Sequence, residues 1–76
     1  MSRSPRITGS ELMAALMKDG FQAVRVRGSH HFLRHKDGRS TVVPVHWGET
    51  LGPGLLHKTL RDCHFSVEDV RRLIRT

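Results

Sequence analysis

The spacing of hydrophobic residues predicts a helix near the beginning of the chain. In TGSELMAALMKDG, residues 8–20, apolar side chains recur three or four positions apart, at Leu12, Met13, Leu16 and Met17. A stripe of this kind is typical of one buried face of a helix, so it indicates core packing rather than a binding site. Thr8 and Glu11 fit a capping box at the helix start, with Ser10 as a competing cap, and Gly20 can end the helix.

Alternation of polar and apolar residues replaces the helical spacing after residue 21. Residues 24–27 read Val-Arg-Val-Arg, which predicts a half-buried strand with its valines turned inward. The segments HHFLRH, residues 30–35, and STVVPVH, residues 40–46, predict two more strands. Asp37-Gly38 between them favours a tight turn. Pro44 lacks a backbone N–H and should lie at a sheet edge or a bulge. Together these segments predict an antiparallel meander.

Two further helical patterns follow the glycine-rich loop WGETLGPG. The segment LLHKTLRDC, residues 55–63, places four apolar side chains roughly on one side, Leu55, Leu56, Leu60 and Cys63. Ser66 begins a last helix, whose buried stripe is Val67, Val70, Leu73 and Ile74. The element order α-β-β-β-α-α predicts one α+β domain over residues 1–76. Residues 1–9 are expected to form a short basic arm.

The register of the strands decides which histidines share a face. If Leu33 joins the valines of the third strand in the core, His30 and His46 lie on the opposite, solvent-facing side. Phe32 would then be exposed as well. Either Phe32 belongs to the core and the register is the reverse, or it is a stacking platform for a base or a partner.

Charge suggests what the protein binds. Thirteen Lys and Arg against seven Asp and Glu give a net charge of +6 and a pI of about 11.1. The arginines cluster on the central strands, which favours a polyanion such as nucleic acid over a merely basic surface. Cys63 is the single cysteine, so no internal disulfide is expected and a cytoplasmic location fits. No apolar run approaches the roughly 20 residues of a membrane span, and no signal-peptide core is visible.

Six histidines raise the hypothesis of a metal site, but their spacing argues against it. On a regular strand His31 and His35 are about 13 Å apart. On a helix His57 and His64 are about 10 Å apart. A zinc ion with bonds of about 2.1 Å could not join either pair. We therefore expect no metal and no cofactor.

General acid–base chemistry suits the histidines better. Gly28 and Ser29 place His30 at the beginning of a strand, where a substrate backbone can approach. Ser29 can hydrogen-bond a phosphate, and three neighbouring arginines can bind anions, Arg25, Arg27 and Arg34. RNA cleavage needs a base for the 2′-hydroxyl, cations for the charged phosphorane and an acid for the leaving oxygen. An exposed strand histidine without a role is the alternative interpretation.

The chain carries two motifs in its central part, RGSHHFLRHKDGR and VVPVHWGETLGPG. The segments ITGSEL and DGF precede them, and LLHKTLRDC and FSVEDV follow them. In this order the chain resembles the HicA-type toxins, small mRNA interferases of toxin–antitoxin modules, over residues 7–70. The resemblance implies a double-stranded-RNA-binding-like fold, with helices on one face of a three-stranded sheet. It implies metal-independent endoribonuclease activity and a HicB-type antitoxin. The family histidine falls on His30, with His31 as the fallback, and the second motif supplies His46.

The second predicted helix departs from the family pattern. The usual Gly-Thr-Leu start is Gly-Leu-Leu here, which leaves Gly54 as the cap. Thr59 replaces a usually apolar residue. His64 replaces the usual glycine before the last helix and would need a left-handed turn. Lys58 is the phosphate-binding candidate on this helix.

Two other classes of function stay open. A non-catalytic RNA-binding module would read duplex RNA by its shape, but simple binding needs arginine more than the Gly-Ser-His motif. A DNA-binding regulator would use the last two helices as a helix-turn-helix, although their apolar stripes belong to the core. A ribonuclease toxin is the leading hypothesis. Its RNA-binding candidates are Arg25, Arg27, Ser29, Arg34, His46 and Lys58.

Overall fold

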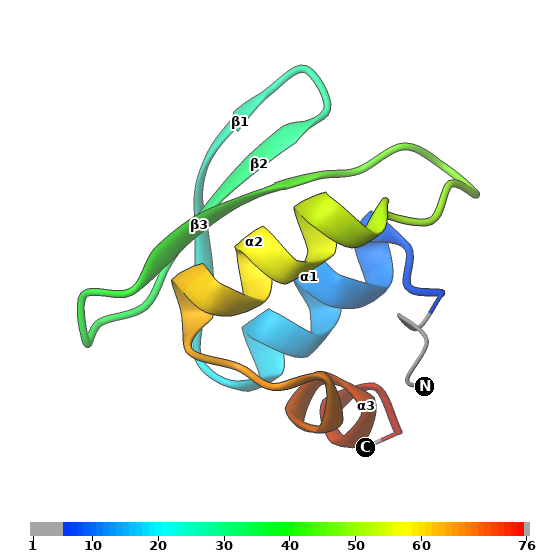
Figure 1. Ribbon diagram of the computed structural model, residues 1–76. Coiled ribbons are helices and arrows are strands. Elements are labelled where there is room, and N and C mark those ends of the chain that lie inside the picture. Colours follow the sequence, from blue (N-terminus) through cyan, green and yellow to red (C-terminus); the bar gives the residue numbers. More distant parts are fainter. Residues whose placement is uncertain (1–5, 76) are drawn as a thin grey trace.

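The computed structural model describes residues 6–75 and contains three helices and three strands (Figure 1). In chain order the elements are α1 (Gly9–Lys18), β1 (Gln22–Arg27), β2 (His30–Arg34), β3 (Ser40–Pro44), α2 (Pro53–Cys63) and α3 (Val67–Arg75). The order α-β-β-β-α-α and the single antiparallel sheet confirm the predicted α+β class. The likeness to double-stranded-RNA-binding domains stays a prediction.

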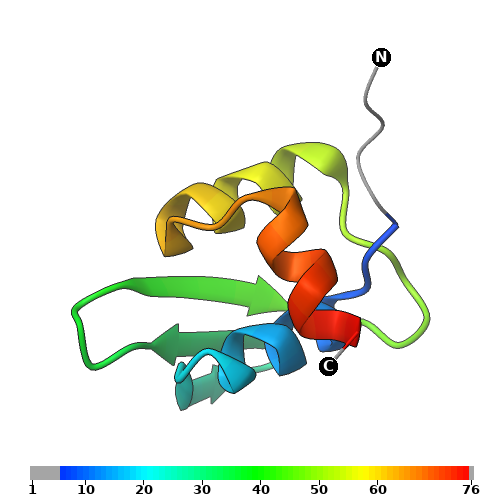
Figure 2. The same ribbon diagram turned by 90° about the horizontal axis from the view of Figure 1, so that it is seen from below.

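The sheet has the order β1-β2-β3, so β2 is central and Pro44 lies on an edge strand, as predicted. Figures 1 and 2 show the helices on one side of the sheet and none on the other. On the helix side, Leu33 of β2 pairs with Thr41 of β3, and both are buried. We call the uncovered side the open face. Its cross-strand rows are Arg27–His30–Pro44, Arg25–Phe32–Val42 and Gln22–Arg34–Ser40.

The hydrophobic core fills the space between the sheet and the helices. Its buried side chains are Ile7, Leu12, Ala15, Leu16, Phe21, Leu33, Val43, Leu56, Leu60, Cys63 and Val70. Helix α3 covers the lower end of this core through Val70, with Leu73 and Ile74 packed against it. In the described part of the chain, no buried side-chain nitrogen or oxygen lacks a hydrogen-bond partner.

Local capping explains where the first and last helices begin. The Thr8 hydroxyl accepts a hydrogen bond from the Glu11 N–H at 3.1 Å, and the Glu11 carboxylate accepts one from the Thr8 N–H at 2.9 Å, which confirms the capping box. Before α3, the Ser66 hydroxyl accepts a hydrogen bond from the Asp69 N–H, and the Asp69 carboxylate accepts one from the Ser66 N–H. The bond from the Ser66 N–H lowers the pKa of the Asp69 carboxyl, so this cap is ionised at neutral pH.

Helix α2 begins two residues earlier than expected. Its N-cap is Gly52 rather than Gly54, and Pro53 occupies the first helical position, where its missing N–H costs nothing. Leu55 is 38% exposed, whereas Thr59 is fully buried. The expected left-handed turn at His64 is confirmed, with φ 57° and ψ 39°.

The predicted burial of the β1 valines and of Met17 was wrong. Val24 and Val26 of β1 are 58% and 57% exposed, because a bulge between Ala23 and Arg25 shifts the register and no helix makes extensive contact with this edge strand. Met17 of α1 is also half-exposed.

The expected basic arm covers residues 1–9, of which 1–5 lie outside the described residues. Ile7 is buried, and its carbonyl accepts a hydrogen bond from the Leu51 N–H at 2.8 Å. Thr8 pairs with Thr50, so the chain just before α1 is tied to the loop that precedes α2.

Candidate active site

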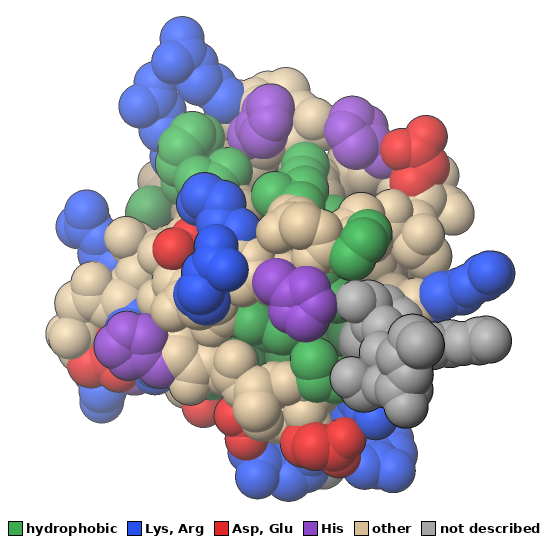
Figure 3. All heavy atoms as spheres, viewed as in Figure 1, with side chains coloured by type: hydrophobic (Ala, Val, Ile, Leu, Met, Phe, Trp, Pro, Cys, Tyr) green, Lys and Arg blue, Asp and Glu red, His purple; other side chains and the backbone are tan. Residues whose placement is uncertain are grey.

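His30 lies at the beginning of β2 on the open face, where it is exposed. Arg27 of β1 is its direct cross-strand partner. In an antiparallel pair, side chains at such positions stand about 5 Å apart at Cβ, so the imidazole and the guanidinium project side by side. Figure 3 shows Lys and Arg side chains projecting from the upper part of the molecule, with His and hydrophobic side chains next to them.

The turn between β1 and β2 holds His30 in place. Gly28 has φ 57°, which a glycine adopts without strain. The Ser29 carbonyl accepts a hydrogen bond from the Val45 N–H at 2.8 Å, which continues the ladder between β2 and β3 past the last strand residue. Ser29 itself is half-buried. The turn is therefore fixed on the side of β3, and His30 begins a strand with a defined direction.

His31 points the opposite way. It pairs with Val26 and Val43 on the helix side and is half-buried. Its Nδ1 lies 3.1 Å from the Ser29 carbonyl oxygen. The two adjacent histidines therefore occupy different faces, as the alternation predicted, and His31 is placed to support the turn that carries His30.

Phe32 lies on the open face and is half-buried, so the alternative in which it joins the core is wrong. The Arg25 guanidinium lies 5.8 Å from the centroid of its ring. Arg34 follows on the same face, exposed. The structure thus gathers all three predicted RNA-binding arginines around His30 and Phe32, namely Arg25, Arg27 and Arg34.

His46 lies outside these rows, in the turn that follows β3. The Glu49 N–H donates to the His46 carbonyl at 3.1 Å, and Gly48 has φ 75°, which closes the turn. Trp47, between them, is 90% exposed. Trp47 was not among the predicted site residues, although a lone tryptophan in a glycine-rich loop is a signal for an exposed contact residue.

Lys58 lies on α2 rather than on the sheet. Its Nζ donates to Asp62 Oδ2 at 3.1 Å, and the Thr41 hydroxyl donates to the same oxygen at 3.0 Å. Burial opposes ionisation of Asp62, but these two bonds outweigh it and lower the pKa of the carboxyl. Lys58 and Asp62 border a hollow of about 420 Å³ that also touches Arg25, Phe32 and Val42.

At the other end of the sheet, Arg39 ties three elements together. Its guanidinium donates to Asp37, to Asp19 at 3.1 Å and to the Cys63 carbonyl at 2.6 Å. It also lies over the rings of Phe21 and Phe65, at 5.0 and 5.7 Å from their centroids.

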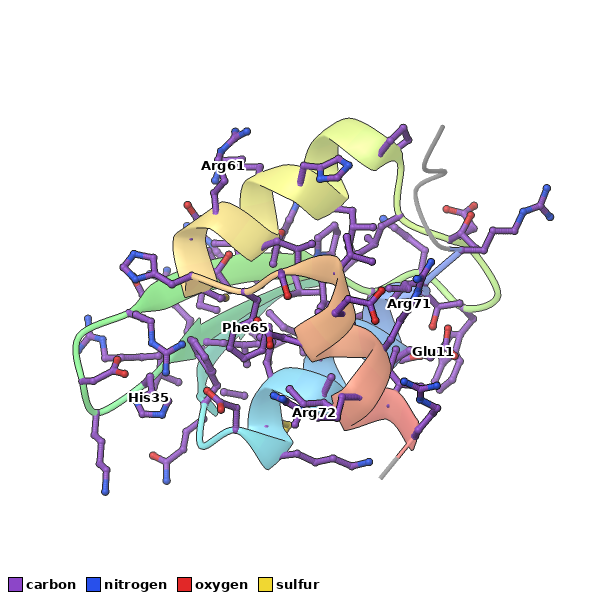
Figure 4. The ribbon with its side chains drawn as sticks, turned by 60° about the horizontal axis from the view of Figure 1, so that its bottom comes forward. Glu11, His35, Arg61, Phe65, Arg71 and Arg72 are labelled. Carbon is purple, nitrogen blue, oxygen red and sulfur yellow. The ribbon has the colours of Figure 1, made fainter. Side chains whose placement is uncertain are left out.

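His35 completes this cluster. The Asp37 N–H donates to His35 Nδ1 at 3.1 Å, and His35 Nε2 lies 3.1 Å from the Asp19 carbonyl oxygen. Figure 4 shows His35 at the turn between β2 and β3, and Phe65 between the sheet and α3. These contacts explain His35 as a structural residue.

Within residues 6–75, no group of three or more His, Cys, Asp or Glu side chains could hold a metal ion. Nor is any helix of this part of the chain long and apolar enough to cross a membrane.

A family model described as the HicA toxin of bacterial toxin–antitoxin systems matches residues 9–64, most of the chain. The matched segment runs from the first residue of α1 to the left-handed turn after α2, so it includes the entire sheet and His30. No curated protein matches the chain.

Proposed function

The chain belongs to the HicA family of toxins from bacterial toxin–antitoxin systems, and from this premise we propose that it cleaves mRNA, with His30 as general acid–base catalyst. The observation that carries the proposal is the Arg27–His30 row on the open face. An exposed imidazole beside a guanidinium combines proton transfer with phosphate binding, which are the two functions that cleavage requires.

In the proposed reaction, the imidazole of His30 removes the proton from a ribose 2′-hydroxyl, and the 2′-oxygen attacks the adjacent phosphorus. The bond from phosphorus to the 5′-oxygen of the next nucleotide breaks, and this oxygen takes up a proton. The products are a 2′,3′-cyclic phosphate and a 5′-hydroxyl. The reaction needs no metal ion, because Arg27 and Arg25 stabilise the charge that develops on the phosphorane.

The remaining predicted contacts hold the RNA on either side of His30. Arg34 extends the open face in one direction, and His46 follows β3 in the other. Ser29 offers a hydroxyl beside His30, and Lys58 offers a charge from α2. His31 stabilises the Ser29 turn and takes no part in proton transfer.

A toxin of this family has an antitoxin partner. We infer that this partner is a HicB-type protein with an acidic surface, which would match the net charge of +6. Addition of the product of a neighbouring antitoxin gene should abolish RNA cleavage at a one-to-one ratio. Undiminished cleavage in the presence of the bound antitoxin would contradict this part of the proposal.

The substitution His30→Ala tests the catalytic assignment. General acid–base catalysis contributes about 10²–10⁴-fold, so the rate of cleavage of a labelled mRNA in EDTA should fall at least 100-fold. The melting temperature should stay within a few degrees of wild type, because His30 is exposed. Growth arrest on expression should also be relieved.

The adjacent His31→Ala variant is the matched control. It should lower stability and retain most of the cleavage rate per folded molecule. Loss of cleavage in His31→Ala alone would move the catalytic role by one residue. Wild-type protein that retards RNA in a gel yet leaves it intact would favour a non-catalytic RNA-binding module.

A further inference from the structure

Three residues of the hollow beside the Arg25–Phe32 row have no part in the reaction described above: Phe32, Val42 and Asp62. We propose that this hollow binds the nucleobase next to the scissile phosphate and that Asp62 selects a base with an exocyclic amino group: adenine, cytosine or guanine rather than uracil. The inference rests on the proposed ribonuclease function, because it places the base relative to His30.

The hollow has an aromatic wall. Phe32 and Val42 face each other across β2 and β3 on the open face, and both are half-buried. A base stacks on an aromatic ring whatever its sequence, and an arginine guanidinium can stack on the base as well. Arg25, 5.8 Å from the ring centroid, lies at the limit of cation–π contact and can take that second role.

The opposite wall is polar and comes from α2. Since α2 packs against β3 from the helix side, a hollow lined by both Phe32 and Asp62 must pass over the outer edge of β3. Figure 3 shows hydrophobic, basic and acidic side chains together over β3 and α2. A carboxylate offers about four acceptor positions, of which Thr41 and Lys58 use two on Oδ2. An amino group of a base is a matching donor.

The size and position of the hollow suit one nucleotide. Its volume of about 420 Å³ lies in the range of small-molecule sites, which is about 300–1,000 Å³. Phe32 is two residues from His30 along β2, about 7 Å away on the same face. A strand of RNA with its phosphate at His30 can therefore place the adjoining base against Phe32.

A peptide strand added to the edge of β3 fits these observations less well. Pro44 lacks the N–H that such a strand would need, and Lys58 and Asp62 line the hollow next to this edge. The edge of β3 therefore favours a compact planar ligand over an added peptide strand.

Cleavage of a set of short RNAs that differ only at the nucleotide adjoining the cut tests the proposal. The wild type should cleave the uracil member roughly tenfold more slowly than the best amino-bearing member. Asp62→Asn keeps the size of the side chain and an acceptor for Thr41, and it should reduce this preference to threefold or less. Phe32→Leu should lower kcat/KM roughly tenfold for every member. The control Met17→Leu changes an exposed side chain on α1 and should match the wild type.

A binding measurement separates this inference from the ribonuclease proposal. In His30→Ala protein, AMP or CMP should shift the NMR signals of Phe32 and Val42 more than UMP does. If the wild type leaves every RNA intact while these shifts remain, the ribonuclease proposal fails and the base site stands. If cleavage is normal but Asp62→Asn and Phe32→Leu behave like Met17→Leu, the base site is overturned. The base site would also be overturned if an antitoxin peptide shifted these signals and no nucleotide did.

Discussion

His30, His31 and His35 stand close together in the sequence, yet each has a different set of neighbours. His30 is exposed beside Arg27, His31 contacts the Ser29 carbonyl, and His35 bridges two aspartate residues. Strand alternation predicted the first difference, because side-chain direction follows from position parity. The role of His35 was not predictable, since Asp19 lies 16 residues away and is brought close only by the packing of α1 under the sheet.

Cys63 is the residue whose chemistry the fold changes most. Burial, with a further contribution from the charge of Asp62, raises the pKa of its thiol from 9.0 to about 11. Only the thiolate is nucleophilic. We therefore expect iodoacetamide at pH 8 to leave the native protein unmodified and to alkylate the protein fully in denaturant, as measured by mass spectrometry.

The same shift affects stability at alkaline pH. Because the folded-state pKa is the higher one, its contribution to the free energy of unfolding is complete below pH 9 and is lost as the pH rises towards 11. A Cys63→Ala variant should therefore lose less free energy of unfolding than the wild type as the pH rises from 9 to 11. Rapid alkylation of native protein at pH 8 would show that the thiol is accessible and contradict the assignment.

At the scale of elements, the sequence was most informative where a structural signal is local. The capping pairs Thr8–Glu11 and Ser66–Asp69 span three residues each, and both form as the sequence indicates. The beginning of α2 was predicted too late, because Pro53 was assigned to the glycine-rich loop although proline suits the first helical turn. The exposure of Val26 was missed because it depends on which strand the helices cover.

The end of α2 offers a test of stored strain. His64 adopts a left-handed conformation that costs a non-glycine residue roughly 1–2 kcal/mol. Glycine removes this cost but loses about 0.5–1 kcal/mol through its more flexible unfolded state. His64→Gly should therefore raise the free energy of unfolding by about 0.5–1 kcal/mol, as measured in urea. His64→Ala keeps the strain and should be no more stable than wild type; equal stability of the two variants would refute this explanation.

At the scale of the whole molecule, the helices on one side leave the other face of the sheet free to present charge. The sequence contains the net charge and predicted the antiparallel strands. The register of these strands places Arg25, Arg27 and Arg34 on one surface. It could not predict the hollow over the β3 edge. That hollow needs α2 to lie against β3, a contact between segments about 20 residues apart.

This charge distribution predicts how binding responds to salt. Each phosphate contact releases counterions, so the logarithm of the RNA affinity should fall linearly with the logarithm of salt concentration. In a His30→Ala background, Arg27→Ala should reduce the slope by roughly 0.7 for a single-stranded RNA. Arg72→Ala on α3, on the helix side in Figure 4, removes the same charge away from the open face and should leave the slope nearly unchanged. Equal effects of the two variants would exclude the open face as the RNA-binding surface.

The Arg39 cluster makes the two ends of the sheet unequal in local stability. One guanidinium joins the turn after β2 to the ends of α1 and α2, so that turn can open only if several contacts break together. The turn between β1 and β2 is held through the Ser29 carbonyl, which contacts the Val45 N–H and His31 Nδ1, and every side chain of β1 is exposed. Its amide hydrogens should therefore exchange with solvent through small local openings, whereas those near Arg39 should exchange only through global unfolding. The end that carries His30 can adjust to a ligand while the core stays folded.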